Sequence, residues 1–426
     1  MKKHLITTAT TLALAIASAN AFANVELRMS WWGGNERHQA TNAALERFQE
    51  KYPDISVKGE YTGWDGHLSR LTTQIAGNTE PDVMQTNWNW MPIFSKDGNG
   101  FYDMTSLSNE LGVSNFPAAS IEMSTNAGKL NGLPVSMTSR VFYFNKDSWA
   151  KAGLAYPKNW DELMKAGPVF KEKLGDKYYP LVIEARDVFA MNRSYMIQKH
   201  NKDIIGTDGM LQFDQKEMTE FFQLYADQVK NHVFPSTKEF ASYGRSNLYE
   251  MRPWIEGEFG GVYMWDSAIA KYADNLKPPM QLELADYPMA DGATDAGLLS
   301  RPSMLFSMGR NTEHPKEAAQ LINFLLNDPD GVKALGLSRS IPLSKSGLNA
   351  LTESGQLDKN SLQYRGYQQA LDVPKKIVAT PYTDNAQLME MFSEEMQHID
   401  YGKATPEEAA KNFLSKGNRL LKKLTR

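Results

Sequence analysis

The chain predicts an α/β fold, on three observations from its 426 residues. Strand-like and helix-like hydrophobic periods alternate over roughly the first ninety residues after the N-terminal segment. The chain has no cysteine but 42% hydrophobic residues, and a chain this long can bury a sizeable core without disulfides. Five of the nine tryptophans follow the first three predicted strands at equivalent places. About 400 residues of mature chain indicate two or three domains.

The N-terminal segment has the order of a secretory signal peptide. Lys2 and Lys3 precede an apolar run over 5–17, and the small-residue exit AFA occupies 21–23. We expect residues 1–23 to be removed and the mature protein to reside in the periplasm. No later segment approaches the ~18 apolar residues of a membrane span. Loss of Lys2 and Lys3 changes the formal charge from −4 to −6. A mildly acidic chain of this kind argues against a nucleic-acid partner.

The first sheet follows from the periodicity. Residues 25–30 alternate as a strand, 40–52 have helical spacing ended by Pro53, and 55–61 alternate again. A second helix over 68–75 precedes a short strand over 82–85. Strands alternating with helices predict a parallel sheet with right-handed crossovers.

Aromatic side chains directly follow each of these strands. Open α/β sheets bind ligands in the crevice at the carboxyl ends of their strands, and flat aromatic rings suit the apolar faces of sugars. Packing beneath loops is the alternative for any single ring. The candidate ligand-binding residues of this region are Trp31, Trp32, Arg37, Trp64, Asn87, Trp88 and Trp90.

Further elements follow in order. Strands are predicted over 141–144, 181–183, 260–265 and 303–308, and helices begin after the N-cap Asn159, at Pro315 and after the capping box at Thr405. Polar residues lie at or beside the ends of these strands, although surface ion pairs are the usual fate of arginines. The candidate binding residues here are Arg140, Arg186, Asn192, Arg193, Trp265, Asp266, Arg301 and Ser303.

Several stretches resemble a known family. PVSMTSRVFYFNKDSWAKAGLAYPKNWDEL, HPKEAAQLINFLLND and IPLSKSG resemble the family-1 sugar-binding proteins that serve ABC importers, a group that includes maltodextrin binders. WWGGNERH and the arginines most resemble the oligogalacturonide binders of pectin uptake. The resemblance implies a two-lobed periplasmic binding protein, each lobe an α/β sheet flanked by helices.

The resemblance also implies how the chain is divided. The N-lobe would hold 24–135 and 302–341, and the C-lobe 136–301 and 342–426. Hinge crossings would fall near 135–140, 296–301 and 341–344. Sugar would lie between the lobes, and closure would trap it for a membrane permease. We expect a monomer that needs no cofactor and no metal.

The chemistry of the candidate side chains limits the class of ligand. Arginine meets carboxylates through a planar fork, so the arginines favour short galacturonides over the alternative of neutral oligosaccharides. A secreted polysaccharide-degrading enzyme is the rival class. Asp65 and Asp266 could supply paired carboxylates, but hydrogen bonding or capping explains them as well. The chain has no HExxH, GxSxG or P-loop motif.

Overall fold

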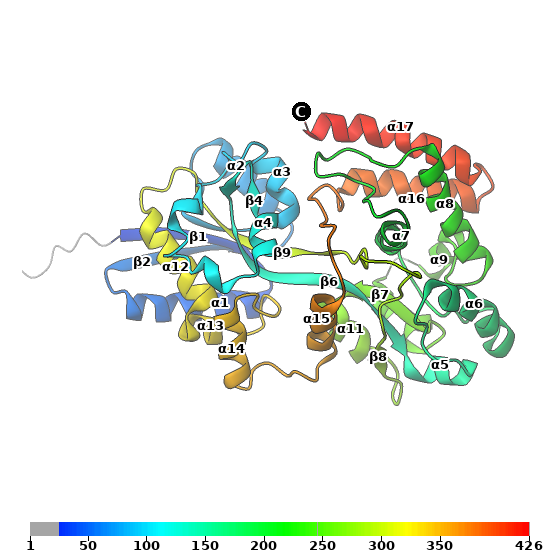
Figure 1. Cartoon of the computed structure of the whole chain (residues 1–426). Coiled ribbons are helices and arrows are strands. Elements are labelled where there is room, and N and C mark those ends of the chain that lie inside the picture. The colour runs from blue at the N-terminus through cyan, green and yellow to red at the C-terminus, as the bar shows by residue number, and fades with distance from the viewer. Residues whose placement is uncertain (1–24, 245, 426) are drawn as a thin grey trace, which may run out of the picture.

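The structure is a computed structural model that describes residues 25–244 and 246–425. The predicted signal peptide lies outside the described residues. Figure 1 shows two groups of elements joined by two long strands. We call the group that contains the first three strands the N-half and the group that contains the C-terminal helix the C-half. This arrangement agrees with the predicted two-lobed α/β fold.

The N-half begins with the predicted parallel sheet. Strands β1 (Val25–Trp32), β2 (Ile55–Thr62) and β3 (Val83–Thr86) lie in the order β2-β1-β3. They are parallel, and helices α1 (Asn35–Lys51) and α2 (His67–Ala76) connect them. Helix α1 begins five positions before the predicted residue 40, directly after Gly34. The sequence therefore predicted this part of the fold correctly and set one helix start too late.

One sheet runs through both halves. Its order is β2-β1-β3-β9-β6-β7, and β8 also pairs with β6. The long strand β6 (Leu133–Asn145) pairs with β9 (Ser300–Met308) through Ser139 and then with β7 (Gly261–Trp265) from Arg140 onward. All these later pairs are antiparallel. Strands β6 and β9 therefore carry the chain between the halves.

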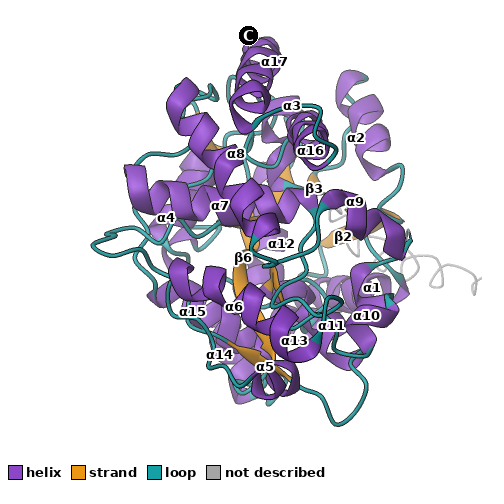
Figure 2. Cartoon of the chain, turned by 90° about the vertical axis from the view of Figure 1, so that its right-hand side faces the viewer, coloured by secondary structure: helices purple, strands orange, loops and turns teal. Residues whose placement is uncertain are grey.

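Helices cover both faces of this sheet, and Figure 2 shows the strands in the interior. The remaining strands are β4 (Thr125–Asn126), β5 (Lys129–Leu130) and β8 (Leu282–Leu284). The N-half also holds α3 (Met91–Phe94), α4 (Ala118–Met123), α12 (Pro315–Asn327), α13 (Pro329–Leu335) and α14 (Lys345–Glu353).

The C-half contains the other helices. They are α5 (Lys146–Ala152), α6 (Trp160–Leu174), α7 (Ala185–His200), α8 (Gln215–Lys230), α9 (Thr237–Phe240), α10 (Arg252–Ile255), α11 (Ile269–Asp274), α15 (Leu362–Asp372), α16 (Ala386–Asp400) and α17 (Pro406–Thr425). The short 3₁₀ turns of the described chain, in both halves, are η1 (Trp88–Trp90), η2 (Met104–Leu107), η3 (Val113–Asn115), η4 (Ala241–Tyr243), η5 (Leu248–Glu250) and η6 (Asp266–Ala268).

The last crossing lies later in the chain than the predicted 341–344. Helix α14 packs on α12 and α13 in the N-half. The Ser344 hydroxyl, which caps α14, also donates to the Leu326 carbonyl at 2.6 Å. The chain therefore passes to the C-half between α14 and α15 (Figure 1). The sequence near 341–344 marks the cap of a helix, because SxxG supplies a serine oxygen to the first turn.

Two local predictions had different outcomes. Thr405 and Glu408 exchange the two hydrogen bonds of a capping box at α17, and Asn159 accepts from the Glu162 amide at α6. Residues 181–183 form only an isolated bridge through Val182 and no strand, so this prediction was wrong. A short apolar run cannot by itself be distinguished from buried irregular chain. None of the helices over 25–244 and 246–425 combines the length and apolar character needed to cross a membrane.

Candidate functional site

Three tryptophans at the ends of three neighbouring strands form one aromatic cluster in the N-half. Trp64 stacks on Trp90 with ring centroids 5.4 Å apart, and Trp32 contacts both rings at 5.3 Å. These residues end or follow β1, β2 and β3, whose parallel register brings their carboxyl ends to one edge. Trp64 is 52% exposed, whereas Trp32 and Trp90 are buried. The cluster thus presents one aromatic side chain to solvent, supported by two others.

A buried histidine supports this cluster from beneath. His67 lies 5.3 Å from the Trp32 ring and stacks on Trp90 at 6.2 Å. Its Nδ1 lies 3.1 Å from the Thr62 hydroxyl. Burial lowers the pKa of His67 to about 4. The imidazole is therefore neutral near pH 7 and acts as an uncharged packing surface.

Trp31 and Trp88 do not belong to this exposed surface. Trp31 is completely buried and donates its indole N–H to His38 Nδ1 at 3.1 Å. Its prediction as a ligand contact is corrected, because alternate residues of a strand face opposite sides of the sheet. Trp88 is 1% exposed and donates to the Met123 carbonyl at 2.7 Å.

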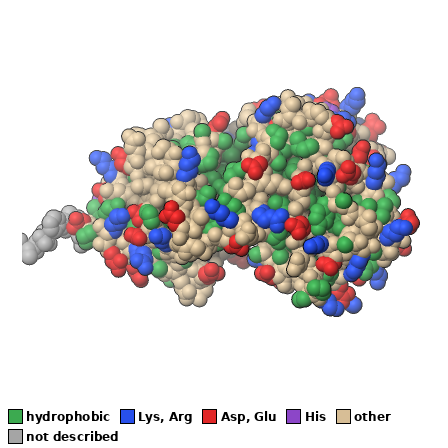
Figure 3. Space-filling model, turned by 60° about the horizontal axis from the view of Figure 1, so that its bottom comes forward, with side chains coloured by type: hydrophobic (Ala, Val, Ile, Leu, Met, Phe, Trp, Pro, Cys, Tyr) green, Lys and Arg blue, Asp and Glu red, His purple; other side chains and the backbone are tan. Residues whose placement is uncertain are grey.

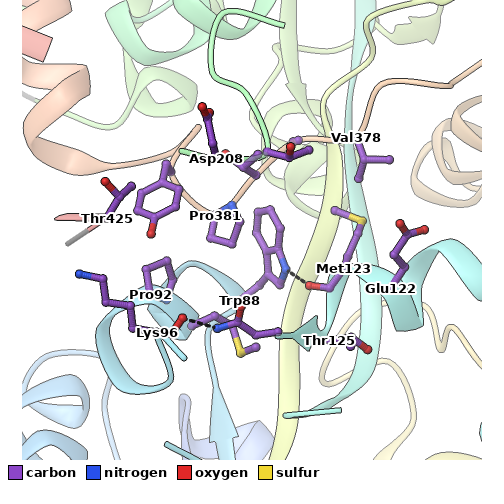
Figure 4. Close-up of a pocket in the computed structure, with 16 residues that line it drawn as sticks. Trp88, Pro92, Lys96, Glu122, Met123, Thr125, Asp208, Val378, Pro381 and Thr425 are labelled. Atoms are coloured by element: carbon purple, nitrogen blue, oxygen red, sulfur yellow. Dashed lines mark hydrogen bonds between the residues drawn. The ribbon is translucent and has the colours of Figure 1, made fainter. Parts of the chain in front are cut away.

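A cavity of ≈ 380 Å³ lies between the halves beside Trp88. Trp88, Pro92 and Lys96 line it from the N-half, and Asp208, Pro381 and Tyr382 line it from the C-half. In Figure 4 the Trp88 indole points toward Pro381, with Met123 beside it. The cavity shows that the halves leave open space on this side.

On the C-half side, two arginines contact a single indole. The guanidinium carbons of Arg140 and Arg301 lie 4.3 Å and 4.9 Å from the centroid of the Trp265 ring. Cation–π contacts of this kind are stronger when they are desolvated, and Arg140 is only 2% exposed. Trp265 itself is half-buried. The sequence therefore identified three residues that the fold does bring together.

Both arginines also have carboxylate partners that sequence reasoning missed. Arg140 forms an ion pair with Asp187, and Arg301 pairs with Asp384 at 3.1 Å. Burial raises the pKa of the Asp187 carboxyl, although Arg140 acts in the opposite direction. Asp187 directly follows the predicted site residue Arg186, but Asp384 has no local signal. Arg186 itself is exposed.

Asp266 is a structural carboxylate in this arrangement. It is 2% exposed and accepts from the Thr138 hydroxyl at 2.8 Å and from the Ser267 amide at 2.7 Å. Burial raises the pKa of Asp266 to about 6 in spite of these donors. It therefore ties β6 to η6 near the crossing and has little exposed surface to offer a ligand.

Two predicted residues lie inside the C-half. Arg193 is fully buried, binds Asp203 through two nitrogens and donates to the Gly297 carbonyl. Asn192 is also fully buried and accepts from Gln228 at 2.8 Å. These two predictions are corrected, because successive positions of helix α7 face different directions and only its first turn reaches the Arg140 cluster.

The last two predicted residues have local partners. Asn87 is half-buried and caps η1 by accepting from the Asn89 amide. Ser303, on β9, bonds to Ser136 on β6 within the strand pair that joins the halves. Their side chains therefore help to hold the elements on which the aromatic and arginine groups lie.

Arg37 lies in the first turn of α1, and the structure adds a second arginine beside it. Arg37 donates to the carbonyls of Ser338 at 2.9 Å and Trp32 at 3.2 Å. Arg339 is the neighbour, and it is 3% exposed. It follows α13, about 300 positions along the chain, so no local pattern could have indicated it.

The surface view shows the boundary between the halves as a recess, with hydrophobic and basic side chains on its borders (Figure 3). Among the described residues, no group of three or more His, Asp and Glu side chains could hold a metal ion. The arrangement combines aromatic faces with guanidinium groups, which suits a ligand that has apolar faces and anionic edges.

Comparisons with known proteins agree with this description. Residues 33–331 match the family model for bacterial extracellular solute-binding proteins. A periplasmic oligogalacturonide binding protein from Yersinia enterocolitica, solved with saturated digalacturonic acid, is 54% identical, with 94% of this chain and all of that chain covered and a TM-score of 0.83. Another structure of that protein, described without a sugar, is 53% identical over the same coverage, with a TM-score of 0.89.

A designed protein is also similar. A structure described as a de novo designed cysteine esterase is 53% identical, covers 95% of this chain and 99% of its own, and has a TM-score of 0.92. Its described activity is a product of design and is a property of that protein.

Proposed function

Because the chain belongs to the bacterial extracellular solute-binding protein family, we propose that it captures short oligogalacturonides between its two halves and delivers them to an ABC-importer permease. The mature protein acts in the periplasm after loss of residues 1–23. Closure of the halves about β6, β9 and the segment after α14 traps the sugar. The similar Yersinia enterocolitica protein, described with digalacturonic acid, supports this ligand class.

The observation that carries the proposal is the placement of Trp265 against Arg140 and Arg301. A half-buried indole held by two arginines offers a fixed aromatic face, and the Arg140 Nε beside it has no hydrogen-bond partner in the described chain. Trp64 offers a second, exposed face from the N-half. A galacturonate ring has an apolar C–H face for stacking and a carboxylate for charge-assisted hydrogen bonds. A neutral sugar would use the aromatic faces but not the charge.

Calorimetry tests the ligand class. We expect the mature protein to bind digalacturonate and to bind the neutral α-1,4-galactobiose much more weakly, because the two sugars differ only at the C6 groups. Maltotriose serves as the control for general sugar binding. Tight binding of maltotriose without a response to digalacturonate would replace this proposal with the neutral-oligosaccharide alternative.

Incubation tests the enzyme alternative. The family and the natural neighbours in the comparisons are binding proteins. We expect oligogalacturonides incubated with the protein to be recovered unchanged by chromatography. Shorter or unsaturated products would assign the protein to the polysaccharide-degrading enzymes instead.

A further inference from the structure

The N-half contains two neighbouring guanidinium groups that lack an acidic partner among the described residues. Arg37 uses its Nε and one terminal nitrogen for the carbonyls of Ser338 and Trp32. Arg339 donates from Nε to the Gln85 side-chain oxygen at 2.8 Å. All of these bonds go to neutral oxygens, so neither guanidinium forms an ion pair, and Glu36 acts on Arg37 only through space.

Arg339 has fewer hydrogen-bond partners than Arg37. Both of its terminal nitrogens are buried and have no protein hydrogen-bond partner in the described chain. Its guanidinium carbon lies 5.5 Å from the centroid of the Phe306 ring. Burial and the positive charge of Arg37 lower the pKa of Arg339 well below its usual value. An unpaired buried charge destabilises the folded protein by several kcal/mol. An anion bound beside Arg339 would therefore stabilise the folded protein.

The buried arginines of the C-half differ in this respect. Arg140, Arg193 and Arg301 each pair with an aspartate of the same half. Their charges are therefore balanced before any ligand arrives. Among the buried arginines of the described chain, Arg339 is therefore the one without an ion pair, although the exposed Arg186 of the C-half also has none.

The position of the pair links it to the aromatic cluster. The Trp32 carbonyl accepts from Arg37 and, at 3.4 Å, from the Gln85 amide that belongs to the partner of Arg339. The Trp32 ring belongs to the cluster with Trp64. A Cβ on Gly33 would lie 2.6 Å from Cδ of Arg37, so this glycine leaves room for the arginine stem. The arginine pair and the aromatic cluster therefore meet at Trp32, through its carbonyl and its ring.

We propose that Arg37 and Arg339 form the carboxylate-selecting site of the N-half, with Arg37 contacting a uronate carboxylate and Arg339 supplying charge from behind it. Arg37 is half-buried, and its remaining terminal nitrogen has no partner among the described residues. Arg339 acts through the low dielectric of its surroundings, where charges interact more strongly than in water. This inference rests on the proposed function and assigns its discrimination against neutral sugars to two residues.

The arginine pair of the N-half is separate from the cluster that contains Arg140. The Ser136 hydroxyl on β6 donates to the Arg339 carbonyl at 2.9 Å, and Arg140 lies four residues further along the same strand. That separation is about 13 Å of strand. The two guanidinium groups also point into different halves, since one bonds to Gln85 and the other to Asp187. The two guanidinium groups are therefore held by different partners.

The test compares digalacturonate with its methyl ester, which keeps the rings and removes the charges. We expect the wild-type protein to prefer the acid. We expect Arg339→Met and Arg37→Met each to reduce this preference about tenfold or more, because a hydrogen bond or charge contact to an ionised group is lost. Arg310→Met is the matched control, since Arg310 is an exposed arginine of the same half that bonds to Asn78. It should leave the preference unchanged.

Thermal unfolding of the free protein separates binding from structure. Arg339→Met should keep or raise the melting temperature, because an uncompensated charge has been removed from the interior. Unchanged acid preference in both the Arg37 and Arg339 variants would overturn the inference while leaving the proposed function intact. Wild-type protein that binds neither the acid nor the ester would overturn both. If Arg339→Met does not fold, Arg339 has a structural role and its part in the proposal is overturned. The Arg37 variant then tests the role of Arg37 alone.

Discussion

Trp64 stacks on Trp90 with their planes inclined by 26°, and the two rings differ sharply in exposure, at 52% and 5%. The pair joins a loop after β2 to one after β3, so parallel register alone places the exposed ring on a buried support. The exposed ring is available to a ligand, and the buried ring fixes its orientation.

We expect Trp64→Ala to weaken digalacturonate binding by about 1–3 kcal/mol, because an exposed aromatic anchor loses its contact area with the sugar. The free energy of unfolding should change little, since half of the side chain is in water. Calorimetry and urea unfolding measure the two quantities. Tyr401→Ala, which removes a 53% exposed aromatic of the C-half, is the control and should bind normally. Equal affinity in Trp64→Ala would remove this ring from the site.

Arg301 and Arg193 form a second contrast. Arg301 contacts Trp265 beside the crossing, whereas Arg193 lies within the C-half and bonds to Asp203. We expect Arg301→Met to weaken digalacturonate binding by about 1.5–3 kcal/mol. Arg193→Met should lower stability but leave the affinity of the folded protein unchanged. Titration of both variants under conditions where circular dichroism shows them folded tests this, and a loss of affinity in Arg193→Met would contradict the assignment.

The buried pair of Arg140 and Asp187 predicts a stability effect. We expect Arg140→Met to destabilise the protein by about 3–5 kcal/mol, because Asp187 is left buried without its cation. The double variant with Asp187→Leu should recover most of that loss, since no charge then remains to be buried. Urea unfolding of both variants measures the difference. A double variant no more stable than the single one would show that the pair's role is packing against Trp265.

His67 predicts a dependence of stability on pH. Its pKa in the folded protein is about 4, against 6.5 for the ordinary side chain. The unfolded chain therefore binds a proton on acidification before the folded chain does, and stability is lost as pH falls from 6.5 toward 4. The loss amounts to about 3 kcal/mol. His67→Gln should lack this component.

The measurement is the difference between the two proteins in unfolding free energy, followed from pH 7 to pH 4. The comparison is needed because Asp266, with its pKa raised to about 6, has the opposite effect. Its contribution to stability is present below pH 3.8 and is lost as pH rises through 6. It should be the same in both proteins. A difference that does not change with pH would contradict the neutral, buried state of His67.

Much of the fold could be read from the sequence because its signals are local. The alternation in β1, the apolar positions of α2, the cap at Asn159 and the capping box at Thr405 each depend on neighbours within a few residues. The grouping of Trp32, Trp64 and Trp90 also followed, because parallel strands place their carboxyl ends at one edge. The final crossing did not follow, since only packing on α12 and α13 assigns α14 to the N-half.

The sequence by itself determined which side chains the site has available: indoles after the first strands, and arginines on or beside later ones. Only the tertiary structure decided which of them are free. Trp31 and Arg193 are withdrawn into the interior by strand alternation and helix phase, and Arg140 and Arg301 are neutralised by aspartates. Arg339 enters beside Arg37 from a distant part of the chain. Such pairings depend on distances between segments far apart in sequence, which hydrophobic periodicity does not encode.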